Sequence, residues 1–293
     1  MNARAWLELC RAPNVFTAVA NVAAGVLLAR LGGFEARDLL LLLASAALYL
    51  SGMILNDVFD RKIDAIERTT RPIPSKRIGV RAAALAGGSL ALLALAAAAL
   101  HGLAPLLVAL ALVGCIIAYD AWLKDSIAGP FTMGGCRALN LLLGLSVASW
   151  ASPWVLSAPL ALGAFTTAVT FLSRLEVHGA GHARPFVGAA GATYLAAVAA
   201  AIALSVALSA SAVALVAALA LSLFLLVRGV RLYRPLWSSA EAPLVGRAIG
   251  GSILLMPALD ALFVAAAGQL VGAALVFALT LPALLLKRWF YMT

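Results

Sequence analysis

The chain has 293 residues, of which 64% are hydrophobic and only 11% are charged, and its mean hydropathy is +1.05. Soluble domains carry about a quarter charged residues, so this composition excludes a soluble protein. The net charge of +9 does not indicate a nucleic-acid partner, because the Lys and Arg residues lie between apolar runs and form no continuous basic domain. We expect a single all-α, polytopic membrane domain over residues 1–293, with nine to ten transmembrane helices around a central cavity.

Apolar runs long enough to span a membrane recur along the whole chain. The connectors that hold most of the Lys and Arg residues are 57–81, 120–129, 174–186 and 230–247. By the positive-inside rule these connectors face the cytoplasm. We therefore expect an integral, multi-pass protein of the cell inner membrane, with its active site facing the cytoplasm. The ten runs lie at about 13–30, 38–56, 82–100, 103–119, 130–150, 157–173, 187–208, 210–229, 248–267 and 269–286.

The second run ends in an acidic segment, although the chain has only 12 acidic residues. On a helix, Asp57, Asp60 and Asp64 line one face within two turns. Three carboxylates this close repel one another and recruit a divalent cation, and an all-oxygen ligand set favours Mg²⁺, with substrate phosphates completing its shell. The pattern predicts a metal site. The alternative is a polar loop with ordinary surface charges.

Basic residues follow the acidic segment, among them Arg71, Lys76 and Arg77. Pro72 and Pro74 exclude a regular helix here, so we expect a loop that can fold back over the carboxylates. Cations that bind phosphate, beside carboxylates that bind Mg²⁺, indicate a diphosphate site. A plain connector is the alternative.

Two further polar clusters follow the fourth and sixth runs. Tyr119 and Lys124 either reach toward diphosphate oxygens or belong to an interfacial belt of Tyr, Trp and Lys. The other cluster holds Arg174 and a single carboxylate, Glu176. His178 lies nearby, but a histidine in such a loop is more often solvated than bound to a metal.

Some polar residues lie within or at the ends of the apolar runs. Asn14, at the cytoplasmic end of the first run, either touches a ligand or caps a helix. Arg137 and Asn140 share one face of the fifth run, and a guanidinium inside a span normally faces a ligand or an internal partner. Asp260, in the ninth run, is either a site residue or pairs internally.

The run Asn56-Asp57-x-x-Asp60-x-x-x-Asp64, followed by Arg71-Pro72-Ile73-Pro74-Ser75, resembles the first signature of the UbiA superfamily of intramembrane prenyltransferases. Arg11-Ala12-Pro13-Asn14 and Tyr119-x4-Lys124 resemble further features of that family. The resemblance implies a helical bundle, classically of nine spans, around a cavity open to the cytoplasm and sideways to lipid. It also implies that a prenyl diphosphate binds through Mg²⁺ and that its isoprenoid chain passes to an acceptor, often aromatic.

The second signature of the family, D-x-x-D-x-x-x-D, is altered here to Ser173-x-x-Glu176-x-x-x-Ala180. One acid cannot hold a second Mg²⁺ as three can, and Arg174 is a fixed positive charge that can bind phosphate in its place. This variant is similar to a divergent, EboC-like branch of the superfamily.

The sequence thus predicts Mg²⁺-dependent transfer of an isoprenoid chain from a prenyl diphosphate to a small aromatic acceptor. The alternative is a non-catalytic carrier or transporter of a lipid or small metabolite that keeps this fold. The expected partners are prenyl diphosphate, the acceptor and membrane lipid, with no nucleic acid. The predicted catalytic residues are Asp57, Asp60, Asp64, Lys124 and Tyr119. The predicted metal ligands are Asp57, Asp60, Asp64 and Glu176. The predicted substrate-binding residues are Asn14, Asn56, Arg71, Lys76, Arg137, Asn140 and Arg174.

Overall fold

The structure is a computed structural model that describes residues 3–31, 33–148, 153–178, 183–208, 210–238 and 241–286, with the backbone alone for 175–178 and 183. Within these ranges the regular structure is entirely helical, which confirms the predicted all-α class. The helices are α1 (Ala3–Leu9), α2 (Val15–Arg30), α3 (Leu39–Phe59), α4 (Arg61–Glu67), α5 (Val80–His101), α6 (Leu103–Ala118), α7 (Ala128–Leu145), α8 (Ser157–His178), α9 (Ala183–Ala207), α10 (Ala212–Ser238), α11 (Ala242–Ala266), α12 (Leu270–Ala278) and α13 (Thr280–Leu286).

Eight helical segments of the described chain are long and apolar enough to cross a membrane, and they contain α2, α3, α5, α6, α8, α9, α10 and α11. Helix α7, of 18 residues, occupies the predicted fifth run and packs against α2, α6 and α8. The predicted tenth run is not a single helix, because it divides into α12 and α13, of 9 and 7 residues. The protein is therefore an integral, multi-pass helical bundle.

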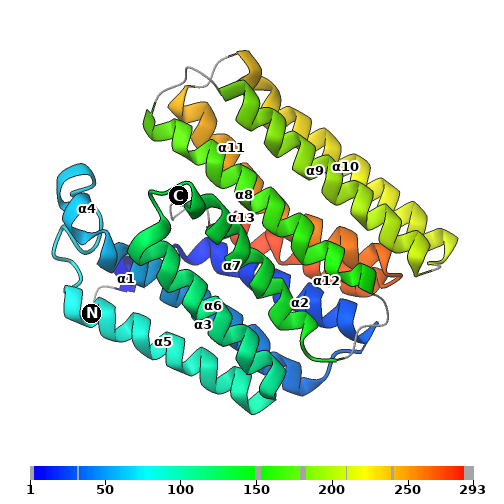
Figure 1. The fold of residues 1–293 in the computed structure, drawn as a ribbon, viewed down its shortest axis with the longest axis horizontal. Helices are drawn as coiled ribbons and strands as arrows, with labels where there is room; N and C mark the ends of the chain where they lie inside the picture. The colour runs from blue at the N-terminus through cyan, green and yellow to red at the C-terminus, as the bar shows by residue number, and fades with distance from the viewer. Residues whose placement is uncertain are drawn as a thin grey trace.

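Figure 1 shows α9 and α10 along one edge of the bundle and α5 along the opposite edge. Helices α2 and α7 lie between these edges and contact each other. Helix α2 also packs on α3 and α11, while α7 packs on α6 and α8. These two helices therefore join the α3, α5 and α6 group to the α8–α11 group. The central cavity stays a prediction.

The close contact between α2 and α7 depends on glycine. A Cβ added to Gly25 would lie 2.3 Å from the carbonyl oxygen of Leu141, and one added to Gly144 would lie 2.2 Å from the carbonyl oxygen of Val22. Small residues let membrane helices approach until their backbones touch. At this separation, polar side chains of α2 can reach those of α7.

The segment between α4 and α5 covers the polar end of α3. Residues 68–79 contain no helix, as the prolines predict. Ile73 and Ile78 are buried in an apolar cluster with Leu9 of α1 and Ile54 of α3. Because this cluster anchors the segment, the loop is folded back toward the acidic residues, as expected.

Gly144→Ala is expected to lower the thermal stability of the protein, because the added methyl group meets backbone atoms of α2. Overpacking of this kind typically costs about 1–3 kcal/mol. Thermal unfolding in detergent measures the effect. The control is Gly114→Ala on α6, whose Cβ meets nothing within 4 Å. Equal melting temperatures for G144A and the unchanged protein would contradict the proposed packing of α2 on α7.

Candidate functional site

The three predicted acidic ligands lie where α3 passes into α4. Asp57 is in the last turn of α3, Asp60 joins the two helices, and Asp64 lies in α4. The N–H of Asp60 donates to the carbonyl of Asn56, and the N–H of Asp64 donates to the carbonyl of Asp60, both at 2.9 Å. The helical path therefore continues through the junction. Asp57 and Asp64 are almost completely buried, at 4% and 3% exposure.

One guanidinium connects two of these carboxylates. Nη1 of Arg71 lies 2.7 Å from Oδ2 of Asp64 and 3.4 Å from Oδ1 of Asp57. Nη2 of Arg11 lies 3.2 Å from the same oxygen of Asp57. Buried charges are tolerated only with partners of opposite sign. The two arginines therefore balance the two buried acids.

Arg11 reaches Asp57 from a strained turn. Its backbone is left-handed, with φ 43° and ψ 51°, a conformation that costs a non-glycine residue roughly 1–2 kcal/mol. Its carbonyl accepts hydrogen bonds from the N–H of Asn14, at 3.0 Å, and from the hydroxyl of Tyr49, at 3.4 Å. These bonds hold the turn. Arg11 was predicted only as part of a family motif and not as a site residue.

Cys10 precedes Arg11 and lies near the same acids. Burial, reinforced by the negative charge of Asp57, raises the pKa of the Cys10 thiol to about 11. The thiol is therefore protonated at neutral pH and is not poised as a nucleophile.

Asp60 has a different cation as its partner. It forms an ion pair with Lys124, which follows the π-helical turn η3 (Tyr119–Leu123) at the end of α6. The N–H of Lys124 donates to the carbonyl of Tyr119 at 3.0 Å, which closes this wide turn. The side chain of Tyr119 is half-buried in the same turn. The structure thus brings the first and second predicted clusters together.

A hydrogen bond beside this ion pair joins the same two elements. Nδ2 of Asn56 donates to Oδ1 of Asp120 at 3.0 Å. Asp120 was not among the predicted site residues, although its position between Tyr119 and Lys124 was a usable signal. The predicted residue Asn56 therefore positions η3 against the end of α3.

The other predicted residues have these positions in the described part of the chain. Nη2 of Arg174 donates to the carbonyl of Lys124 at 2.9 Å, so Arg174 ties the end of α8 to the loop after η3. Lys76 is exposed and forms no ion pair with a described acid. The side chain of Glu176, like all of Ala180, lies outside the described residues. The predicted roles of these residues in binding substrate or metal, and the altered second signature, stay predictions.

A second polar network lies deeper in the bundle and joins three helices. Nδ2 of Asn21 on α2 donates to Oδ2 of Asp260 on α11 at 2.6 Å. Nη1 of Arg137 on α7 donates to Oδ1 of Asn21, also at 2.6 Å. Asn21 and Asp260 are buried, at 0% and 1% exposure. One amide therefore links the guanidinium to the carboxylate, which gives Asp260 the internal partner that the sequence analysis left open.

Asn140 and Asn14 have mainly structural contacts. Nδ2 of Asn140 donates to the carbonyl of Ala18 at 2.8 Å, and its Oδ1 accepts from the hydroxyl of Ser45 at 2.9 Å. Asn140 thus joins α7 to α2 and α3. Asn14 is buried at the start of α2, where its carbonyl accepts from the hydroxyl of Thr17 at 2.8 Å. Their roles in substrate binding stay predictions.

No three His, Cys, Asp or Glu side chains converge as a metal site in the described part of the chain. This arrangement differs from the predicted face of three carboxylates because each acid is opposed by a protein cation, which relieves the repulsion between like charges. The donors nonetheless fit Mg²⁺. Asp57 and Asp64 hold one positively charged nitrogen of Arg71 between carboxylate oxygens, which are the atoms that Mg²⁺ prefers.

The sequence model of the UbiA prenyltransferase family matches residues 18–245. The digeranylgeranylglyceryl phosphate synthase of Ignicoccus hospitalis is 36% identical over 154 residues, covering 50% of this chain and 49% of that protein. The synthase of the same name from Saccharolobus solfataricus is 28% identical over 158 residues, covering 53% and 56%. The chain therefore matches about half the length of these curated relatives.

Solved structures share the fold. A UbiA homologue from Archaeoglobus fulgidus bound to GPP and Mg²⁺ has a TM-score of 0.62 and 16% identity, covering 94% of this chain and 99% of that one. The apo structure of a UbiA homologue from Aeropyrum pernix has a TM-score of 0.65 and 18% identity, covering 82% and 94%. The likeness to these structures supports the fold, and the family match covers most of the sequence. The chain belongs to the UbiA prenyltransferase family.

Proposed function

We propose that this protein is a Mg²⁺-dependent prenyltransferase that moves an isoprenoid chain from a prenyl diphosphate to a small acceptor. The carrying observation is the pairing of acids with cations at the end of α3, where Arg71 contacts Asp57 and Asp64 while Lys124 contacts Asp60. Ionisable groups at membrane depth are costly and usually functional. A carrier protein that does not cleave the diphosphate from its ligand has no evident need for three adjacent acids.

The cations of the site are suited to holding a diphosphate leaving group. In this proposal Arg11, Arg71 and Lys124 exchange carboxylate oxygens for phosphate oxygens when substrate binds. Mg²⁺ held by the three aspartates, with Glu176 as a further candidate ligand, would supply the charge that neutralises the diphosphate. The bond between the allylic carbon and the diphosphate oxygen breaks, and its electron pair leaves with the oxygen. Preplaced donors stabilise that developing charge.

Three further side chains near the acidic cluster have roles in this proposal. The ring of Tyr119 lies in the turn before Lys124 and is suited to shield the positive allylic carbon through its face. Lys76 is exposed on the loop that covers the site, where a flexible cation can close onto phosphate. Arg174 contributes indirectly in the present arrangement, because its hydrogen bond to the carbonyl of Lys124 supports the loop that carries that lysine.

The acceptor is the second part of the proposal. The names of the curated relatives describe a glyceryl phosphate that carries two geranylgeranyl groups. We therefore favour an acceptor with a hydroxyl and a phosphate over the aromatic acceptor expected from the family resemblance. The acceptor oxygen forms the new bond to the allylic carbon, and its proton passes to the released diphosphate. Arg137, fixed by Asn21, is the proposed contact of its anionic group.

We also propose that this site faces the cytoplasm and that the protein lies in the cell inner membrane. Support comes from the distribution of basic residues, because the acidic site lies in connector 57–81, which alone holds seven of the 21 Lys and Arg residues.

Asp64→Asn is expected to reduce prenyl transfer about a hundredfold, since it removes the charge paired with Arg71 while keeping the size of the side chain. The assay uses the purified full chain in liposomes with Mg²⁺ and radiolabelled geranylgeranyl diphosphate, and measures diphosphate release and prenylated product. Asp125→Asn is the matched control, because Asp125 is exposed on the neighbouring loop. Turnover by D64N equal to that of the unchanged protein would refute the mechanism. Binding without release in the unchanged protein would favour the carrier.

Asp260→Asn is expected to raise the KM for the acceptor about tenfold while leaving the KM for prenyl diphosphate unchanged. The substitution alters the carboxyl group that accepts from Asn21 and so loosens the amide that holds Arg137, and one hydrogen bond to a charged group is worth about 1.5–3 kcal/mol. Glyceryl phosphate and aromatic acceptors are assayed in parallel. The control is Ser252→Ala, which removes a buried hydroxyl on the same helix that is 2.6 Å from the hydroxyl of Tyr233. A similar rise in S252A would assign the effect to packing alone.

A further inference from the structure

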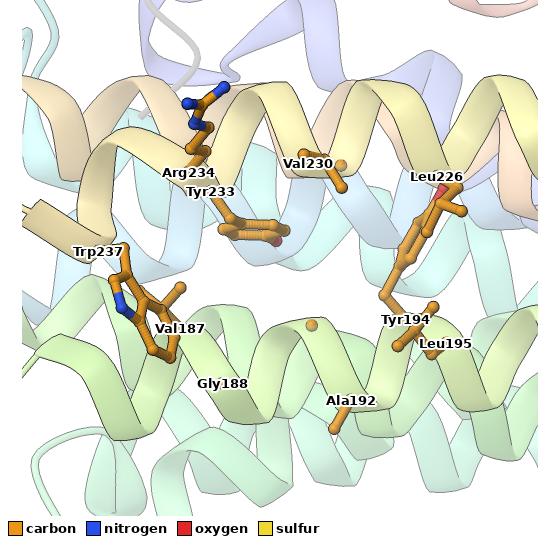
Figure 2. Close-up of a pocket in the computed structure, with 12 residues that line it drawn as sticks. Val187, Gly188, Ala192, Tyr194, Leu195, Leu226, Val230, Tyr233, Arg234 and Trp237 are labelled. Atoms are coloured by element: carbon orange, nitrogen blue, oxygen red, sulfur yellow. The ribbon is translucent and has the colours of Figure 1, made fainter.

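A groove lies between α9 and α10, on the opposite side of the bundle from α5 (Figure 1). Its volume is about 500 Å³. Figure 2 shows its lining: the ring of Tyr233 lies between the two helices, Trp237 lies beside Val187 at one end, and Tyr194 reaches from α9 toward Leu226 at the other end. Almost all of this lining is apolar, so the groove is suited to a hydrocarbon chain.

Three glycines in its walls help to keep the groove open. Gly188 and Gly191 of α9 line it, and a Cβ added to either would meet nothing within 4 Å. Gly229 lines the α10 side, where an added Cβ would only touch the ring of Tyr194 at 3.5 Å. The three glycines therefore leave a channel between α9 and α10.

The length of the groove matches one leaflet of a bilayer. Its α10 wall runs from Leu226 to Trp237, which corresponds to about 16 Å of helix at 1.5 Å per residue. The hydrocarbon core of a bilayer is about 30 Å thick, so this length is close to half of it. A single acyl chain that begins at the membrane surface fills such a groove.

One end of the groove has the character of a membrane interface. Arg234 and Trp237 lie there, and Trp with Arg is typical of the headgroup level. The stretch 228–238 contains three arginines and no acid. The described residues include no ion-pair partner for Arg234. A single phosphodiester, with one negative charge, complements this end better than a diphosphate, which calls for a cluster of cations such as the one around Asp57.

The same end lies on the membrane face that carries the acidic site. Nε of Arg184, at the start of α9, donates to the carbonyl of Trp237 at 3.3 Å. Helix α9 begins where α8 ends, and there Arg174 donates to the carbonyl of Lys124. The groove and the site therefore open on one face but are lined by different residues.

Deep in the groove, Tyr194 supplies a polar group without a partner. Its residue is 3% exposed, and its buried hydroxyl has no hydrogen-bond partner among the described residues. A buried hydroxyl without a partner is costly. Tyr194 lies at the Leu226 end of the groove, away from Arg234, where a double bond in the acyl chain is the acceptor that a lipid offers.

We propose that the groove between α9 and α10 is a binding site for one anionic phospholipid of the surrounding membrane. One acyl chain lies along Gly188, Gly191 and Gly229, and the phosphodiester lies at Arg234. This site is separate from the prenyl-transfer chemistry, so it stands or falls independently of the function proposed above.

The test is native mass spectrometry of the purified full chain, titrated with dioleoyl phosphatidylglycerol and, separately, with dioleoyl phosphatidylcholine. We expect one high-affinity molecule of phosphatidylglycerol per chain. Gly188→Leu and Gly191→Leu should weaken that binding about tenfold, since a Leu side chain replaces several buried methylene groups of the lipid. Gly114→Leu on α6, another glycine with open space around it, should leave binding unchanged.

Arg234→Gln tests the headgroup end by itself, because it changes only an exposed side chain. It should reduce the preference for phosphatidylglycerol over phosphatidylcholine about fivefold, the effect of one basic residue near an anionic lipid surface. Arg231→Gln on the same helix is its control. Thermal unfolding shows whether each variant is folded.

Three results would overturn the proposal. The first is unchanged binding of phosphatidylglycerol by the folded Gly188→Leu and Gly191→Leu variants, together with an unchanged lipid preference in R234Q. The second is an equal loss in the two control variants, which would mean general adsorption of lipid. The third is displacement of phosphatidylglycerol by farnesyl diphosphate in the presence of EDTA, which would make the groove a site for the prenyl substrate.

Discussion

The structure depends on the matching of negative and positive charges where the helices meet the membrane surface. Asp57 and Asp64 are almost fully buried, and they are tolerated because Arg71 lies between them and Arg11 contacts Asp57. Arg71 comes from a loop that is itself held by buried isoleucines, and Arg11 comes from a left-handed turn. Several elements are thus brought to the end of α3 by one electrostatic requirement. The same requirement explains how three acids can lie together at the end of one helix in a chain that is 64% hydrophobic.

In the interior of the bundle, buried polar groups are also paired with one another, but fewer residues take part. Arg137 lies on α7 and Asp260 on α11, and Asn21 of α2 lies between them with one hydrogen bond to each. This bridge is possible only because Gly25 and Gly144 let α2 and α7 approach until backbone atoms touch. The close packing of α2 on α7 at these glycines and the hydrogen bonds of Asn21 therefore support each other. The result is a fixed guanidinium deep in the protein, held by an amide that also bonds a carboxyl group.

Much of the architecture was predictable because a helix that crosses a membrane requires a long apolar run in the sequence. Nine of the ten apolar runs are helices of 16 to 27 residues, and the prolines at 72 and 74 do interrupt the helix. The final run was apolar enough to suggest a span, yet the chain divides into α12 and α13 there, and hydropathy does not report such a break. In the candidate site, Asp57, Asp60 and Asp64 could be predicted to lie near one another, since they are close in sequence.

Contacts between distant parts of the sequence were not predictable in the same way. The pairing of Lys124 with Asp60 joins residues 64 positions apart, and the bond from Asn21 to Asp260 joins residues 239 positions apart. The use of Arg174 to hold a backbone carbonyl, and the place of Arg11 against Asp57, likewise depend on how helices pack. The sequence by itself determined a helical membrane bundle with an acidic and basic cluster at one face, because the cost of placing charge in lipid limits where such residues can lie. Only the tertiary structure decided which cation meets which acid, because an ion pair requires two side chains to come within a few ångströms, and helix packing alone sets that distance.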